Sequence, residues 1–330
     1  MRVFLFHVDI LPISFHMKKL FIVYGGPGRE REVSISSGKN IMESLDKEGI
    51  IYESLLIQED GSWVYKDATL SESEAIRLLK ESNALVFQII HGTFGEDGEL
   101  SSLLEENSIA YVGSSTESMK LTIDKYKTEQ KLRENNIVTT NSTLIDTVSS
   151  INNLHINFPA FIKPKNEGSS ISLYKVKNEE ELHEALEKSI PVFGAMLVQP
   201  FVTGRELTCG VVEIDGEIKA LLPTEVILTK GETFDYEAKY TVGGSKEVTP
   251  AEVDAETTKR VQDIALRVHK TCGCKDISRT DMILQEDGTL VILEINTVPG
   301  MTKTSFIPAQ LNASGHRTTE FLKDMVKKYS

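Results

Sequence analysis

The feature that most constrains the fold of this sequence is residues 279–301, RTDMILQEDGTLVILEINTVPGM, which predict a β-hairpin with one apolar and one polar face. Two apolar runs flank Asp287-Gly288, a dipeptide that favours a two-residue hairpin turn. That turn fixes the pairing register of the two strands. The predicted facing pairs are Glu286 with Thr289, Met282 with Leu293, Asp281 with Glu294, and Arg279 with Asn296.

Because side chains alternate between the two faces of a strand, one face carries a polar group of residues at the end away from the turn. The residues expected on that face are Arg279, Asp281, Glu294 and Asn296, together with Ile283 and Ile292. The residues expected on the opposite, core-facing side are Met282, Leu284, Val291, Leu293 and Ile295.

Two carboxylates directly across a ladder repel each other, and a divalent cation between them removes that cost. Asp281 and Glu294 suit Mg²⁺, which takes one or two carboxylates plus substrate phosphates. Asn296 adds a carbonyl oxygen. Arg279 adds a planar, positively charged guanidinium group that can bind an anion or a developing oxyanion. A surface hairpin with solvated charges is the alternative, but the two isoleucines on the polar face favour the wall of a pocket.

Composition narrows the function classes. The chain has 330 residues, 40% apolar and 26% charged, which allows two or three globular domains. A net charge of −13 gives no support for binding nucleic acid or an anionic membrane. The cysteines Cys209, Cys272 and Cys274 form neither a disulfide framework nor a zinc spacing, which favours a reducing cytoplasm.

Residues 1–16 are apolar, but they lack a small-residue cleavage site and are too short to span a bilayer. We interpret them as an extension or a mis-assigned start, with Met17 as the first native residue or the segment as a surface arm.

Apolar periodicity and turn residues predict alternating strands and helices, as in a Rossmann-like opening followed by mixed domains. The expected strands are 18–24, 50–57, 84–90, 158–164 and 195–202, with a hairpin at 206–226 that turns at Asp215-Gly216. The expected helices begin near Ser34 and cover 71–82, 117–135, 251–271 and 319–329. Because it contains Pro200, strand 195–202 is expected at a sheet edge or as a connector between domains.

Several loops carry candidate site residues. The glycine turn after the first strand is neither a dinucleotide fingerprint nor a Walker loop, and it leads to Glu30. His91 begins a glycine-rich segment, 91–98, where a backbone can approach a ligand closely. Lys163 precedes the Gly/Ser loop 165–172, which has the composition of a phosphate cradle. Residues 228–248 lack any apolar period, which is typical of a functional lid or of disorder.

Three of these segments resemble one family. The hairpin pattern R-x-D and E-x-N-x-x-P-G-M, the segment G-G-x-x-x-E-R-E-V-S and the segment H-G-x-x-G-E-D-G resemble the D-alanine–D-alanine ligase family of ATP-grasp carboxylate–amine ligases. The similarity is collinear from Met17 to the C-terminus. It implies an α/β (α+β) ATP-grasp fold. The implied domains are a Rossmann-like N-terminal domain at 17–123, a central lid domain at 124–202, and a C-terminal domain at 203–330 with the mobile loop 228–248.

The resemblance also implies an activity, which is ATP-dependent ligation of two D-alanines through a D-alanyl phosphate for peptidoglycan synthesis. The implied partners are D-alanine and ATP as small-molecule substrates, two Mg²⁺ ions with Mn²⁺ as a substitute, and a second copy of the chain in a homodimer. The implied location is the cytoplasm, and neither nucleic acid nor membrane is expected as a partner.

The residue roles implied by the resemblance fall into three groups. The metal ligands are Asp281, Glu294 and Asn296. The ATP-binding residues are Lys125, Lys163, Phe161, Gln199, Val202, Glu206 and Lys239. The catalytic and substrate-binding residues are Glu30, His91, Ser169, Lys239, Tyr240, Arg279, Ser305 and the backbone N–H of Gly300.

Three positions depart from the family pattern, which usually has Gly at Ser172, Glu at Gln199 and Leu at Phe306. Of these, Ser172 and Phe306 keep open a related ligase that uses D-serine, D-lactate or a different amine as its second substrate. A nucleotide-binding regulatory protein without catalysis is a second alternative, although the intact hairpin residues argue against it. A protein kinase is disfavoured because the sequence has no H-R-D or D-F-G motif.

Overall fold

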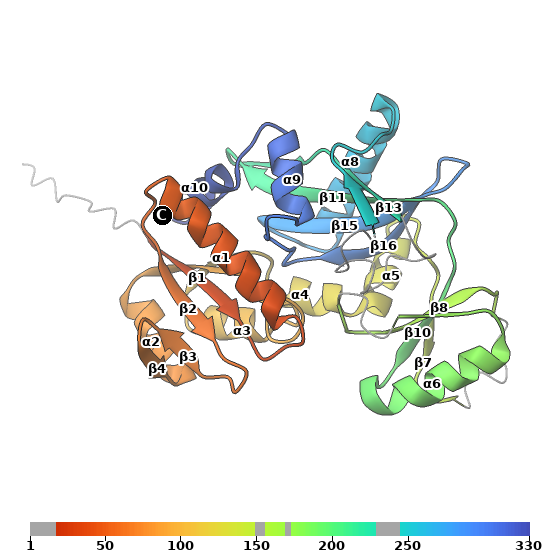
Figure 1. Cartoon of the computed structure of the whole chain (residues 1–330), viewed down its shortest axis with the longest axis horizontal. Helices are drawn as coiled ribbons and strands as arrows, with labels where there is room; N and C mark the ends of the chain where they lie inside the picture. Colours follow the sequence, from red (N-terminus) through yellow and green to blue (C-terminus); the bar gives the residue numbers. More distant parts are fainter. Residues whose placement is uncertain (1–17, 149–155, 169–172, 229–244) are drawn as a thin grey trace, which may run out of the picture.

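The computed structural model describes the chain outside residues 1–17, 149–155, 169–172 and 229–244. Its strands form three sheets, and the helices pack on their faces (Figure 1). The mixed α/β architecture is the one that the sequence predicts.

The first sheet has the order β4-β3-β2-β1-β5-β6, and β2, β1, β5 and β6 run parallel, as in a Rossmann-like domain. Its strands are β1 (Lys19–Gly25), β2 (Glu53–Ile57), β3 (Trp63–Tyr65), β4 (Ala68–Leu70), β5 (Ala84–Gln88) and β6 (Ala110–Val112). Its helices are α1 (Arg31–Lys47), α2 (Glu72–Glu81) and α3 (Glu99–Glu106). Helix α1 therefore begins earlier than the start predicted near Ser34.

The second sheet is antiparallel, with the order β7-β10-β8-β9, and α6 packs on it. Its elements are β7 (Thr143–Ile145), β8 (Ala160–Pro164), β9 (Tyr174–Val176), α6 (Glu179–Phe193) and β10 (Met196–Pro200). Of the two alternatives predicted for 195–202, the edge strand was wrong, because β10 pairs with both β7 and β8. The connector between domains stays a prediction. Pro200 is the last residue of β10, so its missing N–H interrupts little of the ladder.

Two helices occupy the span that the sequence predicts as one helix, 117–135. They are α4 (Thr116–Ile123) and α5 (Lys125–Glu134). Asp124 between them has an extended backbone (φ −80°, ψ 91°) and its side chain accepts a hydrogen bond from Lys127 N. An N-cap residue of this kind starts a new helix, and here it fixes the direction of Lys125 at the first position of α5.

The third sheet has the order β14-β13-β11-β15-β16, and β12 also pairs with β11. Its strands are β11 (Arg205–Ile214), β12 (Glu217–Ala220), β13 (Thr224–Leu228), β14 (Ser245–Val248), β15 (Ile277–Leu284) and β16 (Leu290–Asn296). The remaining helices are α8 (Ala255–Thr271), α9 (Phe306–Ala313) and α10 (Thr318–Tyr329). Strand β14 was not predicted, because it lies within the stretch 228–248 that has no apolar period, and α9 was not predicted either.

The register at the polar end of the β15–β16 hairpin is confirmed, since Asp281 faces Glu294 and Arg279 faces Asn296. The predicted two-residue turn was wrong. Gln285 N donates to Thr289 O and Gly288 N donates to Gln285 O, which closes a longer loop with Gly288 in the left-handed region at φ +83°. A loop with a left-handed residue at its last position is the next common hairpin connection after the two-residue turns.

A β-bulge compensates for this longer loop. Near the turn Met282 faces Ile292, whereas Asp281 faces Glu294, so Leu293 is the extra residue on β16. The predicted Met282–Leu293 and Glu286–Thr289 pairs are therefore wrong. The bulge exchanges two predicted faces, because Ile292 packs in the core and Leu293 lines a cavity.

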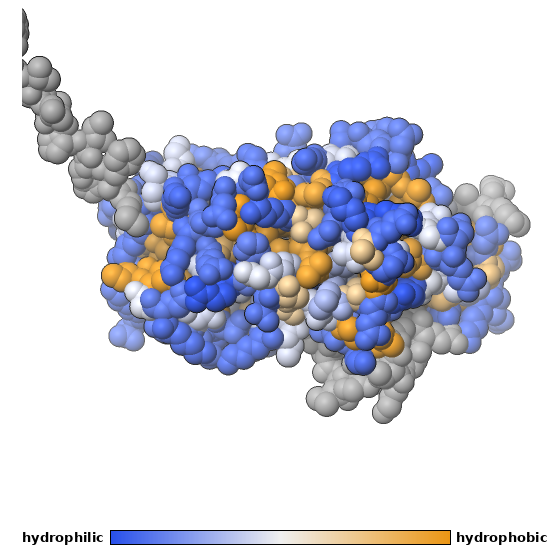
Figure 2. Space-filling view, turned by 90° about the horizontal axis from the view of Figure 1, so that it is seen from above, coloured by the Kyte–Doolittle hydropathy of each residue, from blue (hydrophilic) through white to orange (hydrophobic). Residues whose placement is uncertain are grey.

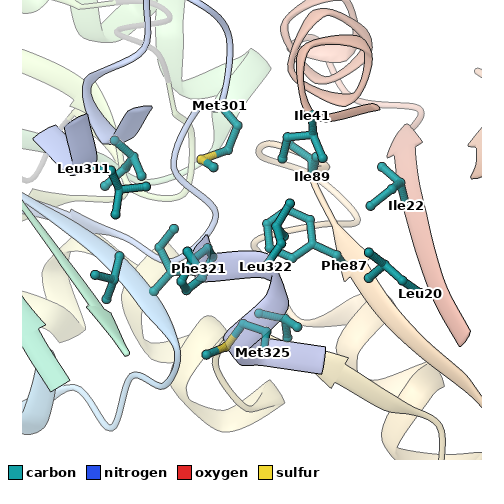
Figure 3. Close-up of a cluster of buried hydrophobic side chains, with 14 of the residues drawn as sticks. Leu20, Ile22, Ile41, Phe87, Ile89, Met301, Leu311, Phe321, Leu322 and Met325 are labelled. Carbon is teal, nitrogen blue, oxygen red and sulfur yellow. The ribbon is translucent and has the colours of Figure 1, made fainter. Parts of the chain in front are cut away.

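A large apolar core joins the first sheet to the C-terminal elements (Figure 3). Phe321, Leu322 and Met325 of α10 lie between Phe87 of the first sheet and Leu311 of α9. Phe87 and Phe321 make an edge-on ring contact with centroids 6.3 Å apart. The end of the chain therefore holds together elements that are far apart in the sequence.

All three cysteines are buried and free, and Cys272 is the C-cap residue of α8. None of the helices in the described part of the chain is long and apolar enough to cross a bilayer. Hydrophilic residues dominate the face drawn in Figure 2 and interrupt its apolar patches.

A buried carboxylate, Asp276, adds a polar connection across the same junction. It accepts hydrogen bonds from Gly113 N (2.7 Å), Lys328 Nζ (2.7 Å) and Tyr329 Oη (2.8 Å). These donors belong to the loop after β6 and to α10, so one side chain joins the first sheet, the third sheet and the C-terminal helix.

We predict that Asp276→Ala lowers the free energy of unfolding by about 1–3 kcal/mol, because it leaves a buried backbone donor and the Tyr329 hydroxyl without a partner. Asp263→Ala is the matched control, since it removes an exposed helical ion pair with Lys259 and is expected to cost about 0.5 kcal/mol or less. Urea denaturation of the two variants checks this. Equal losses would contradict the role given to Asp276.

Candidate active site

Two cavities meet at the polar end of the β15–β16 hairpin. The first has a volume of about 430 Å³ and the second about 800 Å³. Glu294 and Gly168 line both, so the hairpin carboxylate stands at their junction.

The first cavity lies between the second and third sheets. It brings together residues predicted separately from four segments of the sequence. Those lining it are Lys125, Phe161, Lys163, Gln199, Val202, Glu206, Asp281 and Glu294. Phe161 and Phe201 are in ring contact, with centroids 5.6 Å apart, and Lys175 Nζ lies 4.3 Å from the Phe201 ring centroid. Aromatic walls beside lysines suit a flat, anionic ligand.

The second cavity lies between α1, the loop after β5 and the segment that follows β16. The predicted residues lining it are Glu30, His91, Arg279, Glu294, Asn296, Gly300 and Ser305. Phe306, noted as a departure from the family pattern, lines it as well. The predicted substrate residues and the predicted nucleotide residues thus lie in two different cavities.

Asp281 is only 8% exposed and is held from several sides. Arg279 binds it through two hydrogen bonds, Nε to Oδ1 at 2.9 Å and Nη2 to Oδ2 at 2.8 Å. Thr208 Oγ1 donates to Oδ1 at 2.5 Å, and Asn296 Nδ2 to Oδ2 at 3.3 Å. Two-point binding by a guanidinium fixes the plane of a carboxylate as well as its position.

Arg279 is partly buried, and this burial works to lower its pKa. The ion pair and hydrogen bonds with Asp281, together with the charges of Glu294 and Glu96, outweigh that effect and raise the pKa of Arg279. Its guanidinium therefore stays charged in the wall of the second cavity, 5.3 Å from the centroid of the Phe306 ring.

Lys125 supplies a second positive charge, next to the other hairpin acid. Its Nζ lies 3.4 Å from Glu294 Oε2 and donates to Glu167 O at 2.6 Å. The break between α4 and α5 places this lysine in the first cavity.

The hairpin residues fit a hard divalent cation such as Mg²⁺. Asp281 and Glu294 face each other across the ladder, and Asn296 adds an amide oxygen. Two carboxylates with a neutral oxygen leave coordination positions for water and phosphate, as Mg²⁺ prefers. In the described part of the chain no group of three or more His, Cys, Asp or Glu residues is placed to hold a metal, which is consistent with this smaller ligand set.

Glu30 enters the second cavity between two glycines. A Cβ atom on Gly92 would lie 2.9 Å from Glu30 Oε2, and one on Gly168 would lie 2.7 Å from the same atom. Both loops therefore lie close to the end of the Glu30 side chain, which would have to move to admit a Cβ atom at either glycine. The Gly168 contact also brings the loop after β8 against the first domain.

His91 is buried beside Glu30 and faces Ser37. Its Nδ1 lies 2.8 Å from the carbonyl oxygen of Val298, so Nδ1 carries the proton that is donated, and Nε2 points to Ser37 Oγ at 3.5 Å. Burial lowers the pKa of His91, and the nearby Glu30 only partly opposes this. The ring is therefore neutral near pH 7.

Glu96 joins the His91 loop to the segment after β16. Its carboxylate is 8% exposed and accepts from Gly92 N at 2.8 Å and from Val298 N at 3.3 Å. Burial, with the charge of Glu30, raises its pKa to about 7. Glu96 thus positions the backbone on two sides of the second cavity.

Helix α1 holds the next part of that segment. Ser37 Oγ accepts from Met301 N at 3.2 Å, and Asn40 Nδ2 donates to Met301 O at 2.8 Å. Ser305 Oγ accepts from Thr302 N at 2.9 Å, and a Cβ on Gly300 would lie only 2.8 Å from Ser305 Oγ. The turn 300–305 is therefore compact, and it presents Gly300 and Ser305 to the second cavity.

Some predicted residues lie outside the part of the chain that the structure describes. These are Ser169, Ser172, Lys239 and Tyr240. Other site residues were missed by the sequence reasoning, namely Glu96, Thr208 and Gly168. Glu96 stood in the quoted segment 91–98, whereas nothing local in the sequence marks Thr208, whose role depends on pairing with Asp281 across the sheet.

Comparisons with known proteins agree with this geometry. Residues 19–85 match the family model described as "D-ala D-ala ligase N-terminus", and residues 120–327 match "D-ala D-ala ligase C-terminus". A D-alanine–D-alanine ligase from Fervidobacterium nodosum is 36% identical, covering 94% of this chain and 98% of the relative. One from Leptospira interrogans is 34% identical with the same coverage.

Solved structures are similar over nearly the whole chain. The VanG D-Ala:D-Ser ligase from Enterococcus faecalis superposes with a TM-score of 0.81 at 29% identity, covering 95% of this chain and 99% of that one. The D-alanine–D-alanine ligase from Coxiella burnetii superposes with a TM-score of 0.77 at 26% identity, covering 95% and 94%.

We predict that Glu96 makes stability fall as pH rises. A carboxyl with a pKa of about 7 in the fold and about 4.5 when unfolded binds more protons in the native state between those values. The wild type should therefore lose stability relative to Glu96→Gln between about pH 5 and about pH 8, by at most about 1.4 kcal/mol per pH unit. Urea denaturation at both pH values checks this. A stability difference that does not change with pH would contradict the raised pKa.

Proposed function

The chain belongs to the D-alanine–D-alanine ligase family, and we propose that it joins two D-alanines into D-alanyl-D-alanine at the expense of ATP, for peptidoglycan synthesis. One observation carries the proposal for the site. The carboxylate pair Asp281–Glu294 stands where a cavity with aromatic and lysine walls meets a second, polar cavity. Phosphoryl transfer from a nucleotide to a carboxylate needs such a junction.

The first cavity is proposed to hold ATP. Phe161 lies beside the base, and Gln199, Val202 and Glu206 line the part of the cavity expected to hold adenine and ribose. Lys125, whose Nζ lies 3.4 Å from Glu294 Oε2, and Lys163 line the same cavity and are proposed to bind the phosphates. Lys239, which lies outside the described residues, is proposed to reach the phosphates from loop 228–248.

Asp281, Glu294 and Asn296 are proposed to hold two Mg²⁺ ions, for which Mn²⁺ is a substitute. The ions supply charge neutralisation between ATP and the acyl oxygen when bound. The protein residues do the positioning. Arg279, Thr208 and Asn296 fix the plane and the position of the Asp281 carboxylate through four hydrogen bonds.

The second cavity is proposed to hold both D-alanines. The Glu30 carboxylate would bind the ammonium of the first, with the neutral His91 ring beside it. Ser169 and Tyr240 are proposed to extend this contact through a hydrogen-bonded chain. Ser305, with Lys239, would bind the carboxylate of the second D-alanine.

The chemistry has two steps. The carboxylate of the first D-alanine takes the γ-phosphoryl group of ATP, which gives a D-alanyl phosphate and ADP. The amine of the second D-alanine then attacks the acyl carbon, and phosphate leaves. The oxyanion formed in the second step would lie between Arg279 and the backbone N–H of Gly300, both of which line this cavity.

The wider assignments are also proposals. We divide the chain into domains at 17–123, 124–202 and 203–330, with loop 228–248 closing over the site to exclude water from the acyl phosphate. By family resemblance we further propose that the protein is a cytoplasmic homodimer.

A second candidate function differs only in the second substrate. Phe306 stands in the second cavity against Arg279, where its bulk limits the space around the second amino acid. D-Serine or D-lactate is the alternative substrate. Phosphate release across a panel of D-amino acids and D-lactate distinguishes the candidates.

We predict that Asp281→Asn and Glu294→Gln each lower ATP turnover by on the order of a hundredfold or more, since each removes one negative charge from the proposed metal site. The matched control is Glu286→Gln, because Glu286 is an exposed acid in the loop of the same hairpin. D-alanine-dependent phosphate release measures the effect, and circular dichroism checks that the fold is kept. Normal product formation by either site variant would count against the metal assignment.

We also predict that the second substrate is an amine. Tyr240 matches the tyrosine of the dipeptide-forming ligases, whereas related depsipeptide ligases tend to carry Phe there. The enzyme should therefore prefer D-alanine to D-lactate at neutral pH, as measured by product analysis with both present. A preference for D-lactate would refute this.

A further inference from the structure

Strand β11 changes partners in the middle of the third sheet. Residues Glu206 to Thr208 pair with β13, and residues from Val211 onward pair with β12. The carbonyl of Thr208 and the N–H of Gly210 lie at this change of partner. Buried backbone groups of this kind need a hydrogen-bond partner.

Gln310 of α9 supplies that partner. Its Oε1 accepts from Gly210 N at 2.8 Å, and its Nε2 donates to Thr208 O at 2.9 Å and to Thr224 Oγ1 at 3.1 Å. The side chain is 0% exposed. Its amide therefore makes the hydrogen bonds that a neighbouring strand would make at this point of β11. Both the Oε1 and the Nε2 atom of the amide have partners.

The two β11 residues that Gln310 binds are the neighbours of the site. Gly210 faces Arg279 across the β11–β15 ladder, and Thr208 faces Asp281 and donates its hydroxyl to it. Gln310 thus binds the two β11 residues that pair with Arg279, the proposed oxyanion residue, and with Asp281, the proposed metal ligand.

The N-terminal end of α9 carries Ser305, which is proposed to bind the second D-alanine in the cavity that Arg279 also lines. Ser305 caps α9 and Phe306 is its first residue, with its ring over the Arg279 guanidinium. Gly210 permits this approach, because a Cβ there would lie 2.5 Å from Ile307 Cδ1 and 2.8 Å from Gln310 Oε1. A helix held this closely by its own side chain has little freedom to slide along β11.

We propose that Gln310 is a positioning residue that sets the separation between Ser305 and Arg279, and so determines how tightly the second D-alanine binds. The inference rests on the proposed function of this cavity. Gln310 touches no substrate; it acts through α9 and β11. Its loss is expected to weaken binding of the second substrate far more than binding of ATP, because α9 contributes Phe306 to the second cavity and no residue to the first.

A merely structural role is the competing explanation, and the chain offers a matched control for it. Gln262 of α8 also donates its side-chain amide to the backbone of this sheet, at Ala220 O (3.2 Å) and Leu221 O (3.3 Å). It does so from a helix that packs in a different core and lines neither cavity. Both glutamines should matter for stability, but only Gln310 should matter for the second substrate.

The experiment compares wild type, Gln310→Met, Gln262→Met and Gln310→Glu by D-alanine-dependent phosphate release. For Gln310→Met we expect the KM for the second D-alanine to rise by on the order of tenfold to a hundredfold, with the KM for ATP nearly unchanged. Gln262→Met should lower the melting temperature and leave both KM values nearly as in wild type.

Gln310→Glu adds a pH readout that a purely structural role would not give. A protonated carboxyl can accept from Gly210 N and donate to Thr208 O, whereas an ionised one cannot donate. The KM of this variant for the second D-alanine, divided by that of wild type, should therefore rise with pH. This variant also tests the inference if Gln310→Met does not fold.

The outcomes distinguish a failure of the proposed function from a failure of the inference on Gln310. A wild-type protein without D-alanine-dependent phosphate release contradicts the proposed function. An active wild type contradicts the inference on Gln310 alone in three cases: Gln310→Met shows the wild-type KM for the second D-alanine, Gln262→Met raises that KM equally, or the Gln310→Glu ratio does not vary with pH.

Discussion

The structure depends on keeping two carboxylates, Asp281 and Glu294, face to face at one end of a hairpin. Alone, the pair would destabilise the ladder. Two positive charges offset this repulsion. Arg279, on β15 itself, pairs with Asp281, and Lys125, at the start of α5, pairs with Glu294. The result is a polar centre that is already aligned, and it stands where the two cavities meet.

Most of the surrounding architecture serves to bring distant segments to this centre. The Glu96 carboxylate ties the loop after β5 to Val298, and Ser37 and Asn40 of α1 hold Met301. The apolar core that α10 shares with the first sheet also joins the first sheet to the C-terminal elements. Because the second cavity lies between these two groups of elements, its shape depends on how they pack together as much as on any single residue that lines it.

The sequence predicted the polar end of the hairpin correctly, although the reason given for it was incomplete. Asp287-Gly288 indicated a two-residue turn, but Gly288 takes the left-handed position of a longer loop, and the bulge at Leu293 restores the register. A turn dipeptide constrains backbone angles without fixing loop length, so the faces of Ile292 and Leu293 were exchanged. The carboxylate pairing survived because the two shifts cancel.

Other differences have the same kind of cause, since they depend on contacts between residues far apart in the chain. Pattern alone does not show that α9 packs on Gly210 or that Gln310 completes a sheet one hundred positions away in sequence. Local patterns marked Glu30, His91 and Arg279 as candidates, and the family resemblance marked Ser305; all four line the second cavity. The positions that hold those residues in place were visible only in the fold.

The most direct test of the central claim is a count of Mn²⁺ ions bound per chain, measured by electron paramagnetic resonance with and without ADP and D-alanine. The account predicts nucleotide-dependent binding of two Mn²⁺ per chain at the facing acids of the hairpin, with a signal that changes when Glu294 is replaced. A wild-type protein that binds nucleotide without binding Mn²⁺, or whose Mn²⁺ signal is unaffected by the loss of Glu294, would contradict it.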